Sequence, residues 1–462
     1  MPAHDPSARS LEQDGAVPAP PDGRRAGPAL LSPGGERRGG RRLTTALLLG
    51  FMLVNFADKA VLGLAGPAIM SDFGISRQEF GLAQAAFFAL FSVSALAVSA
   101  MTRRVRTPVL LLAMAVVWSC AQLPMVWTAA GFATLVVTRV LLGAAEGPAT
   151  PVAVHHLHGW FDNRERALPT AVLMVGAAGG TAVAAPVLSF VIATWGWRWA
   201  FGAVGLIGLL WAVIWWRYGA EGPLAPPPAT AREGHREPTV PLRRILLSPT
   251  FLSACVGSFA AYWLMSSLLT WFPDYLETVH GWSARGAGLV VGAGAVANGV
   301  VLLVHGLVAQ RAARSGRPGR LPRGSGSGLL LLLSSAAVVT LALTGNDVVR
   351  VAMLFGPVAL ALVMLTVSQT SCARIAPPAQ RGVVLGASVC VMALGGILAP
   401  LVLGTIVDAG ATVGDGYRNG WIFTAVLLGV AGLLAAVFLR PERDAERLGV
   451  PESTTPHLSL MH

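Results

Sequence analysis

Long apolar segments alternate with short polar ones along most of the chain. A helix that crosses a membrane needs about 20 mostly apolar residues. Twelve segments meet this requirement, six on each side of a polar, Pro-rich stretch at 219–246. They lie at roughly 43–69, 80–101, 108–128, 131–156, 167–194, 199–218, 248–277, 284–310, 327–344, 349–373, 383–408 and 419–439. The pattern predicts an all-α membrane protein with 12 transmembrane helices in two six-helix bundles.

The polar segments divide the chain further. Residues 1–42 are rich in Pro, Gly, Arg and Ala and contain no apolar run, so we expect a disordered tail there. The predicted order is then a tail at 1–42, a bundle at 43–218, a central loop at 219–246, a bundle at 247–440 and a second tail at 441–462.

The composition supports a lipid environment. Of 462 residues, 54% are apolar and 12% are charged, whereas a soluble domain carries about 25% charged residues. An ordinary soluble enzyme, a disordered chain and a coiled coil are therefore excluded. The use of Arg in place of Lys at all basic positions except Lys59 is typical of a GC-rich bacterial genome.

The net charge of +11 indicates topology and not nucleic-acid binding, since no basic soluble domain is present. With the N-terminus inside, 27 basic residues fall in inside segments and five in outside segments. Cytoplasmic loops carry such an excess of Arg and Lys. The asymmetry predicts that both termini are cytoplasmic and that the protein is a multi-pass protein of the bacterial plasma membrane.

Four charged residues lie inside predicted spans of the first half. They are Asp58 and Lys59 in the first span and Arg139 and Glu146 in the fourth. Charge inside a bilayer is costly and is a functional hypothesis by default. Arg139 and Glu146 are seven residues apart, which places them on one helix face. If the first and fourth helices face each other, the four side chains can converge in one cavity.

Such a cavity suggests proton coupling. Desolvation favours the neutral form of a buried carboxylate, whereas a nearby cation favours the charged form. When Glu146 or Asp58 takes up a proton, its basic partner is freed and can hold an anionic substrate. Substrate and proton binding would then be coupled, which is symport. The alternative is a structural ion pair that locks the two helices together.

The second half shows no charge in the middle of a predicted span. Its candidate substrate contacts are polar or aromatic, namely Tyr262, Ser266, Ser267, Thr270, Trp271, Asn298, His305 and Gln369. So few hydroxyl groups favour an aromatic or short-chain carboxylate over a sugar acid. Hydrogen bonding between helices is the alternative role for these groups. We expect Asp274 and Glu277 to face water, with a gate as the alternative.

Several motifs resemble the major facilitator superfamily. They are NFADKAVLGLAGPAI (55–69), RVLLGAAEGPATP (139–151), WFDNRERALPTAVLMVGAAGG (160–180), TWGWRW (194–199), LTWFPDYL (269–276) and APPAQRGVVLG (376–386). The likeness covers roughly 43–440. It is greatest to the anion:cation symporter branch, which includes sugar-acid, sialic-acid and phosphate carriers.

The resemblance implies roles for individual residues. The family's N-Y-x-D-R pattern falls on Asn55, Asp58 and Lys59, where Lys keeps the charge of Arg but loses its bidentate fork. It implies proton coupling at Glu146 and Asp58, and anion binding or gating at Arg139 and Lys59, with Asn55 as a further substrate contact. The inner gate would use Arg103, Arg106 and Arg311. The acids of the family's gate loops are replaced by Thr102 and Gln310.

These observations predict a secondary active transporter that carries a small organic anion with a proton, or with sodium, by alternating access. Proton-driven efflux of a natural product or drug is the first alternative, and a non-transporting membrane sensor or enzyme the second. We expect no cofactor, no metal site and no nucleic-acid partner, and a monomer in the lipid bilayer. The three histidines His155, His156 and His158 lack the i, i+4 spacing of a helical metal site.

Overall fold

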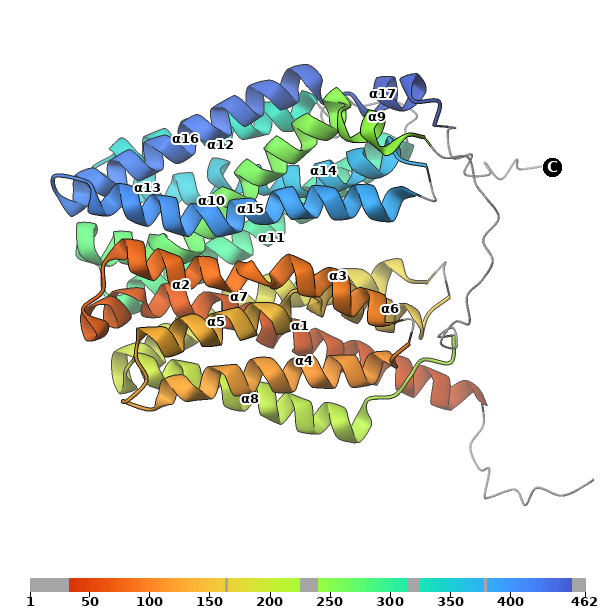
Figure 1. Ribbon diagram of the computed structural model, residues 1–462, viewed down its shortest axis with the longest axis horizontal. Helices are drawn as coiled ribbons and strands as arrows, with labels where there is room; N and C mark the ends of the chain where they lie inside the picture. The colour runs from red at the N-terminus through yellow and green to blue at the C-terminus, as the bar shows by residue number, and fades with distance from the viewer. Residues whose placement is uncertain are drawn as a thin grey trace, which may run out of the picture. The chain divides into compact units, whose positions relative to one another are not determined.

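The computed structural model describes residues 33–102, 104–162, 165–224, 240–314, 325–377 and 380–450. In these ranges the regular structure is entirely helical (Figure 1). The α-helices are α1 (Pro33–Phe73), α2 (Arg77–Ala89), α3 (Phe91–Met101), α4 (Thr107–Gln122), α5 (Phe132–Glu146), α6 (Ala149–His158), α7 (Ala167–Trp195), α8 (Trp197–Tyr218), α9 (Leu242–Leu246), α10 (Pro249–His280), α11 (Ala284–Arg314), α12 (Ser325–Leu343), α13 (Asp347–Phe355), α14 (Val363–Arg374), α15 (Arg381–Asp408), α16 (Val413–Phe438) and α17 (Pro441–Arg447). Two 3₁₀ turns, η1 (Leu123–Val126) and η2 (Pro357–Leu362), follow α4 and precede α14.

Within the described residues, eleven helical stretches are long and apolar enough to cross a membrane, and each corresponds to one of the twelve predicted segments. The remaining segment, 80–101, is divided at Leu90 into α2 and α3, each shorter than a membrane span. α2 ends at Ala89 with Leu90 as its C-cap, and α3 begins at Phe91. The twelfth span therefore stays a prediction.

Parts of the segments that were predicted to be polar tails and a central loop are helical in the structure. α1 begins at Pro33, ten residues before the predicted span, and α17 lies in the predicted C-terminal tail. The short α9 belongs to the predicted central loop. Residues 1–32, 225–239 and 451–462, which belong to the predicted tails and central loop, lie outside the described residues.

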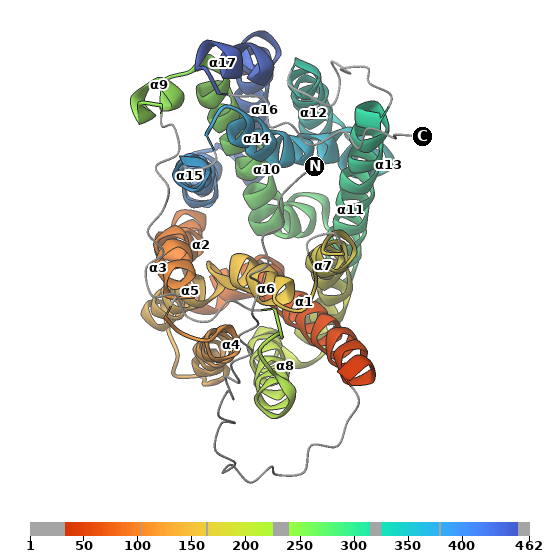
Figure 2. The same ribbon diagram turned by 90° about the vertical axis from the view of Figure 1, so that its right-hand side faces the viewer.

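Residues 41–462 form one compact unit. Within it, α2 packs on α5 and α4 on α8 before the central loop, whereas α12 packs on α16 and α10 on α15 after it. Helices before the loop pack on helices after it, above all α2 on α15 and α7 on α11. Both pairs lie side by side in Figure 2. This packing places α1, α5 and α10 around the site described below.

Two glycines allow these helices to approach closely. A Cβ atom at Gly63 of α1 would overlap the carbonyl oxygen of Leu269 on α10. A Cβ atom at Gly81 of α2 would overlap the carbonyl oxygen of Pro400 on α15. Small residues at helix interfaces permit this backbone contact. At these two positions the backbones of helices on the two sides of the central loop therefore touch directly.

Asp444 anchors α17 to the start of α10. Its Oδ2 atom accepts hydrogen bonds from Thr250 N at 3.0 Å and from Thr250 Oγ1 at 2.7 Å. Its Oδ1 atom accepts from Arg443 Nε at 3.0 Å. Burial disfavours the carboxylate, but the hydrogen bonds from Thr250 and Arg443 outweigh it and lower the pKa of Asp444. The ionised form is thus the one that the fold stabilises.

We expect Asp444→Ala to lower the stability of the folded protein by about 2 kcal/mol, the scale of hydrogen bonds to a charged group. Because folding lowers the pKa, the carboxylate contributes above the ordinary aspartate pKa of about 4, and the contribution is lost as the pH falls through the lowered value. Thermal unfolding of wild type and variant should therefore differ at pH 7 and converge in acid. Glu446→Ala, at an exposed position of the same helix, is the control.

Candidate functional site

Four charged side chains from α1 and α5, three of them buried and Lys59 half-buried, lie close together. Asp58 is fully buried, and Arg139 and Glu146 are each 1% exposed. Lys59 Nζ lies 3.4 Å from Glu146 Oε2 and donates a hydrogen bond of 2.7 Å to Asn55 Oδ1. The ammonium group also lies 4.0 Å from the centre of the Phe56 ring, a cation–π distance. Lys59 is thus held by one acid, one amide and one aromatic face.

Asp58 and Arg139 are connected through Gln122, the last residue of α4. Gln122 Nε2 donates to Asp58 Oδ1 at 2.7 Å, and Arg139 Nη2 donates to Gln122 Oε1 at 3.1 Å. Sequence reasoning missed Gln122, because an amide near a helix end is not distinctive. Its position in an otherwise apolar span was the only available signal.

Several polar atoms of this network have no hydrogen-bond partner among the described residues. They are Asn55 Nδ2, Asp58 Oδ2, Arg139 Nε and both carboxylate oxygens of Glu146, of which Oε2 has only the ionic contact with Lys59. Leaving a buried polar atom unsatisfied costs about 1–3 kcal/mol. Arg139 instead lies over the ring of Phe201, with its Cζ atom 5.0 Å from the ring centre. The network therefore keeps unused hydrogen-bonding capacity, which suits a site that exchanges protons and ligands.

A small cavity of about 20 Å³ adjoins the network. It collects four of the predicted site residues, Lys59, Arg139, Tyr262 and Ser266. The other lining residues are Gln84, Phe87, Phe88, Met265 and Leu269. A cavity of this size holds about one water molecule. In this state the site is therefore closed around its charged groups.

The other predicted contacts of the second half do not line this cavity. Trp271 is fully buried and donates from Nε1 to the carbonyl oxygen of Pro400 at 3.1 Å, so it joins α10 to α15. Ser267 and Thr270 are buried on α10. Asn298 on α11 and Gln369 on α14 are half-buried.

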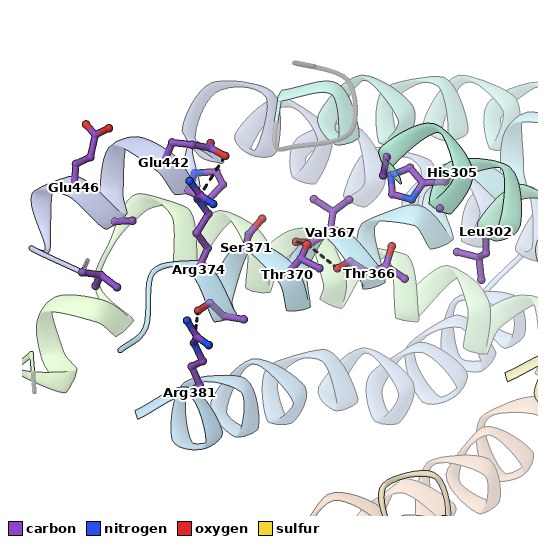
Figure 3. A pocket seen from close by; sticks show the side chains of 16 residues that line it. Leu302, His305, Thr366, Val367, Thr370, Ser371, Arg374, Arg381, Glu442 and Glu446 are labelled. Carbon is purple, nitrogen blue, oxygen red and sulfur yellow. Dashed lines mark hydrogen bonds and ion pairs between the residues drawn. The ribbon is translucent and has the colours of Figure 1, made fainter. Parts of the chain in front are cut away.

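His305 lines a different and larger cavity of about 590 Å³. Figure 3 shows it between α11, α14, α15 and α17, with Arg374 facing Glu442 at 3.6 Å. This cavity shares no lining residue with the small one. We place the candidate transport site at the small cavity, because the buried charges are there.

The predicted inner-gate residues are only partly described. Arg103 lies outside the described residues. Arg106 is exposed at the N-cap of α4, and Arg311 is exposed near the end of α11. Thr102 is half-buried and Gln310 is exposed. These positions leave the roles of the three arginines as predictions.

The expectation that Asp274 faces water is wrong. Asp274 is 1% exposed, and Arg77 Nε at the start of α2 donates to its Oδ2 atom at 2.8 Å. The hydroxyl of Tyr417 on α16 donates to the same oxygen. Next to this pair, Gln78 N donates to Asp408 Oδ2 of α15 at 2.7 Å. We call Arg77, Asp274, Tyr417 and Asp408 the Arg77 latch; it connects α2 to α10, α15 and α16.

The second half also contains buried charge that the span pattern did not predict. Besides Asp274, Arg350 of α13 is fully buried and is paired with Asp347. Arg350 Nη2 also donates to the carbonyl oxygen of Thr344 at 2.8 Å. These two partners fasten the start of α13, and the Cζ atom of Arg350 also lies 5.7 Å from the centre of the Tyr275 ring on α10. Glu277 is half-buried near the end of α10.

No group of three or more metal-ligating side chains occurs among the described residues. His156 instead has Thr107 Oγ1 at 2.6 Å from its Nδ1 atom. The Thr107 hydroxyl also contacts Glu221 Oε1 at 2.7 Å. His156 therefore helps to hold the residues after α8 against α4 and α6.

Long apolar helices around a closed, charge-lined cavity define a multi-span membrane protein of the transporter class. The family model described as Major Facilitator Superfamily matches residues 47–400. The chain belongs to this superfamily, as its motifs indicate.

Two curated relatives are transporters of sugar acids. The hexuronate transporter of Bacillus subtilis (strain 168) is 28% identical over 241 residues, which cover 52% of this chain and 57% of that protein. The D-galactonate transporter of Escherichia coli O6:H1 is 26% identical over 428 residues, covering 88% of this chain and 97% of that protein. The resemblance to the sugar-acid and organic-anion branch is thus confirmed, and the relatives are transporters and not enzymes.

Solved structures show the same fold. A bacterial homologue of the human lysosomal transporter Spinster, inward-facing and unoccupied, has a TM-score of 0.75 at 19% identity and covers 88% of this chain and 98% of its own. A D-xylose–proton symporter has a TM-score of 0.68 at 17% identity, covering 87% and 98%. At these identities the likeness concerns the fold.

Proposed function

We propose that the protein carries a small organic anion across the bacterial plasma membrane together with a proton, by alternating access. The observation that carries this proposal is the network of Asp58, Lys59, Arg139 and Glu146 beside a closed cavity. In a site with two bases and two acids, a proton that binds to one acid releases its basic partner, which can then bind an anion. Relatives that transport sugar acids support the choice of an anion.

The proposed architecture has 12 spans in two six-helix bundles, with both termini in the cytoplasm and one monomer as the transport unit. The excess of basic residues in the inside segments supports this orientation. α2 and α3 together would form the second span.

The coupling step follows from the contact between Lys59 and Glu146. While Glu146 is ionised, Lys59 is engaged. When Glu146 takes up a proton, the pair loses its attraction and Lys59 becomes a positive partner for an anion. Arg139, whose Nε atom has no partner among the described residues, supplies the second positive contact. Tyr262 and Ser266 of α10 complete the site from the opposite wall.

Alternating access is supported by the state of the site. Room for about one water molecule cannot hold a carboxylate with several heavy atoms. The anion must therefore enter after a movement between helices before and after the central loop. The Arg77 latch and the close backbone contacts at Gly63 and Gly81 are the contacts that such a movement breaks or re-forms.

A thermal-shift measurement on purified protein tests the substrate class. A panel of D-galactonate, D-glucuronate, sulfoacetate and benzoate is compared with hydrophobic cations at pH 5.5 and 7.5. A ligand that binds only the folded state raises the unfolding temperature by mass action. We expect carboxylates or sulfoacetate to stabilise the wild type, and Arg139→Ala to lose at least tenfold in apparent affinity. Stabilisation by bulky cations alone would contradict anion symport and favour drug or natural-product efflux.

A further inference from the structure

We infer that Gln122 is a positioning residue that keeps Arg139 available for the transported anion. The inference rests on the proposed function of the site. It assigns a role to a side chain that touches neither the small cavity nor the Lys59–Glu146 pair.

The two ends of the Gln122 amide are chemically different, and each end has a matching partner. Its NH₂ group donates to the carboxylate of Asp58 at 2.7 Å, and its carbonyl oxygen accepts from the guanidinium of Arg139 at 3.1 Å. A carboxylate can only accept and a guanidinium can only donate. Of the uncharged side chains, an amide of this length can satisfy both partners at once.

This bridge separates two charges that would otherwise pair. Arginine and a carboxylate form a bidentate pair that uses two of the five N–H groups. With Gln122 between them, the bridge uses only one N–H group of Arg139. Arg139 lies on the cavity wall, and its Nε atom has no partner among the described residues. The guanidinium thereby keeps donors for an incoming anion.

The surroundings hold Gln122 in place. It is 1% exposed and ends α4, and η1 follows at once from Leu123 with Pro124 as its second residue. Gly205 of α8 faces its stem, and a Cβ atom there would lie 3.3 Å from the Gln122 Cβ. The amide is therefore clamped between α8 on one side and the two charged groups on the other.

The sharpest test is Gln122→Glu, which has nearly the same shape. The new carboxylate would pair directly with Arg139 and repel Asp58. We expect the KM for anion exchange to rise at least tenfold in proteoliposomes at equal pH on both sides. The probe is the labelled anion among D-galactonate, D-glucuronate, sulfoacetate and benzoate that the wild type exchanges.

A double variant separates position from net charge. Asp58→Asn combined with Gln122→Glu restores the total charge and volume of the wild type but leaves the carboxylate against Arg139. We expect its KM to stay at least tenfold above that of the wild type, which has the same total charge. A KM equal to that of the wild type would show that only net charge matters and would overturn the inference.

Folding and function have separate readouts. Unfolding temperature and yield are measured for each variant, and Gln122→Asn replaces Gln122→Glu if the latter does not fold. The shorter amide cannot reach both partners, so the same rise in KM is expected. An unchanged KM in a folded variant overturns the role of Gln122. Failure of the wild type to exchange any of the four anions would instead contradict the proposed function.

Discussion

Glu146→Gln is expected to abolish proton-driven accumulation of the anion and to leave anion exchange in place. The amide has the shape of the protonated acid but cannot release a proton. Lys59, which lies 3.4 Å from Glu146 in the structure, would stay permanently free of its ionic partner. Uptake into proteoliposomes under an inward proton gradient should fall at least tenfold, whereas exchange at equal pH should remain within about threefold of the wild type.

Glu165→Gln provides the matched control. Glu165 is exposed and accepts a hydrogen bond from Arg41 at 2.9 Å, away from the central network. The same change of acid to amide should leave both assays unchanged. Accumulation by Glu146→Gln against a concentration gradient, driven by protons, would show that the proton binds elsewhere.

The second large effect is expected at the Arg77 latch. Asp274→Asn removes the only negative charge within contact of Arg77 among the described residues, while keeping the shape of the side chain. Because Arg77 is half-buried, losing its carboxylate partner is expected to cost about 1.5–3 kcal/mol, the scale of hydrogen bonds to a charged group, which corresponds to a shift of about 10- to 150-fold in an equilibrium constant. This loss affects only the state in which α2 and α10 are in contact. The variant should therefore populate the state that is open at this end.

Spin labels at two exposed positions can measure this opening. Leu82 on α2 and Thr405 on α15 lie on helices that pack together. In Asp274→Asn the distribution of distances between the labels should move to longer values, and maximal transport should fall because the latch re-forms less often. Asp415→Asn is the control, since Asp415 pairs with Arg418 of its own helix at 3.0 Å. Identical distributions in Asp274→Asn and wild type would show that Arg77 and Asp274 do not control opening.

Span positions could be predicted because the length of an apolar run is a local property. The approach of Asp58, Lys59, Arg139 and Glu146 could also be anticipated, since charges inside spans are few and the seven-residue spacing sets one face. The contacts that these four side chains make with one another could not be anticipated. The sequence-based argument assigned no partners within the group, and in the structure Gln122 stands between Asp58 and Arg139.

Tertiary partners explain the remaining errors. Asp274 has its arginine partner 197 residues away, and no local pattern reveals that distance. A carboxylate near the end of an apolar run therefore looked solvated although it is buried. Similarly, Trp271 and Ser267 share a helix with Tyr262 and Ser266, but only the latter pair lines the cavity. The rotation of α10 about its own axis decides which of these side chains face the cavity. That rotation depends on how α10 packs against α15 and α16.

The four central charges all belong to α1 and α5, whereas the other residues that line the cavity are uncharged and belong to α2 and α10. Under the proposed function, Lys59 and Arg139 contact the charged group of the anion, and the uncharged side chains of α2 and α10 face the rest of it. A lineage with this arrangement can change the size or shape of the anion it accepts by substitutions in α2 and α10, while the buried charges stay as they are.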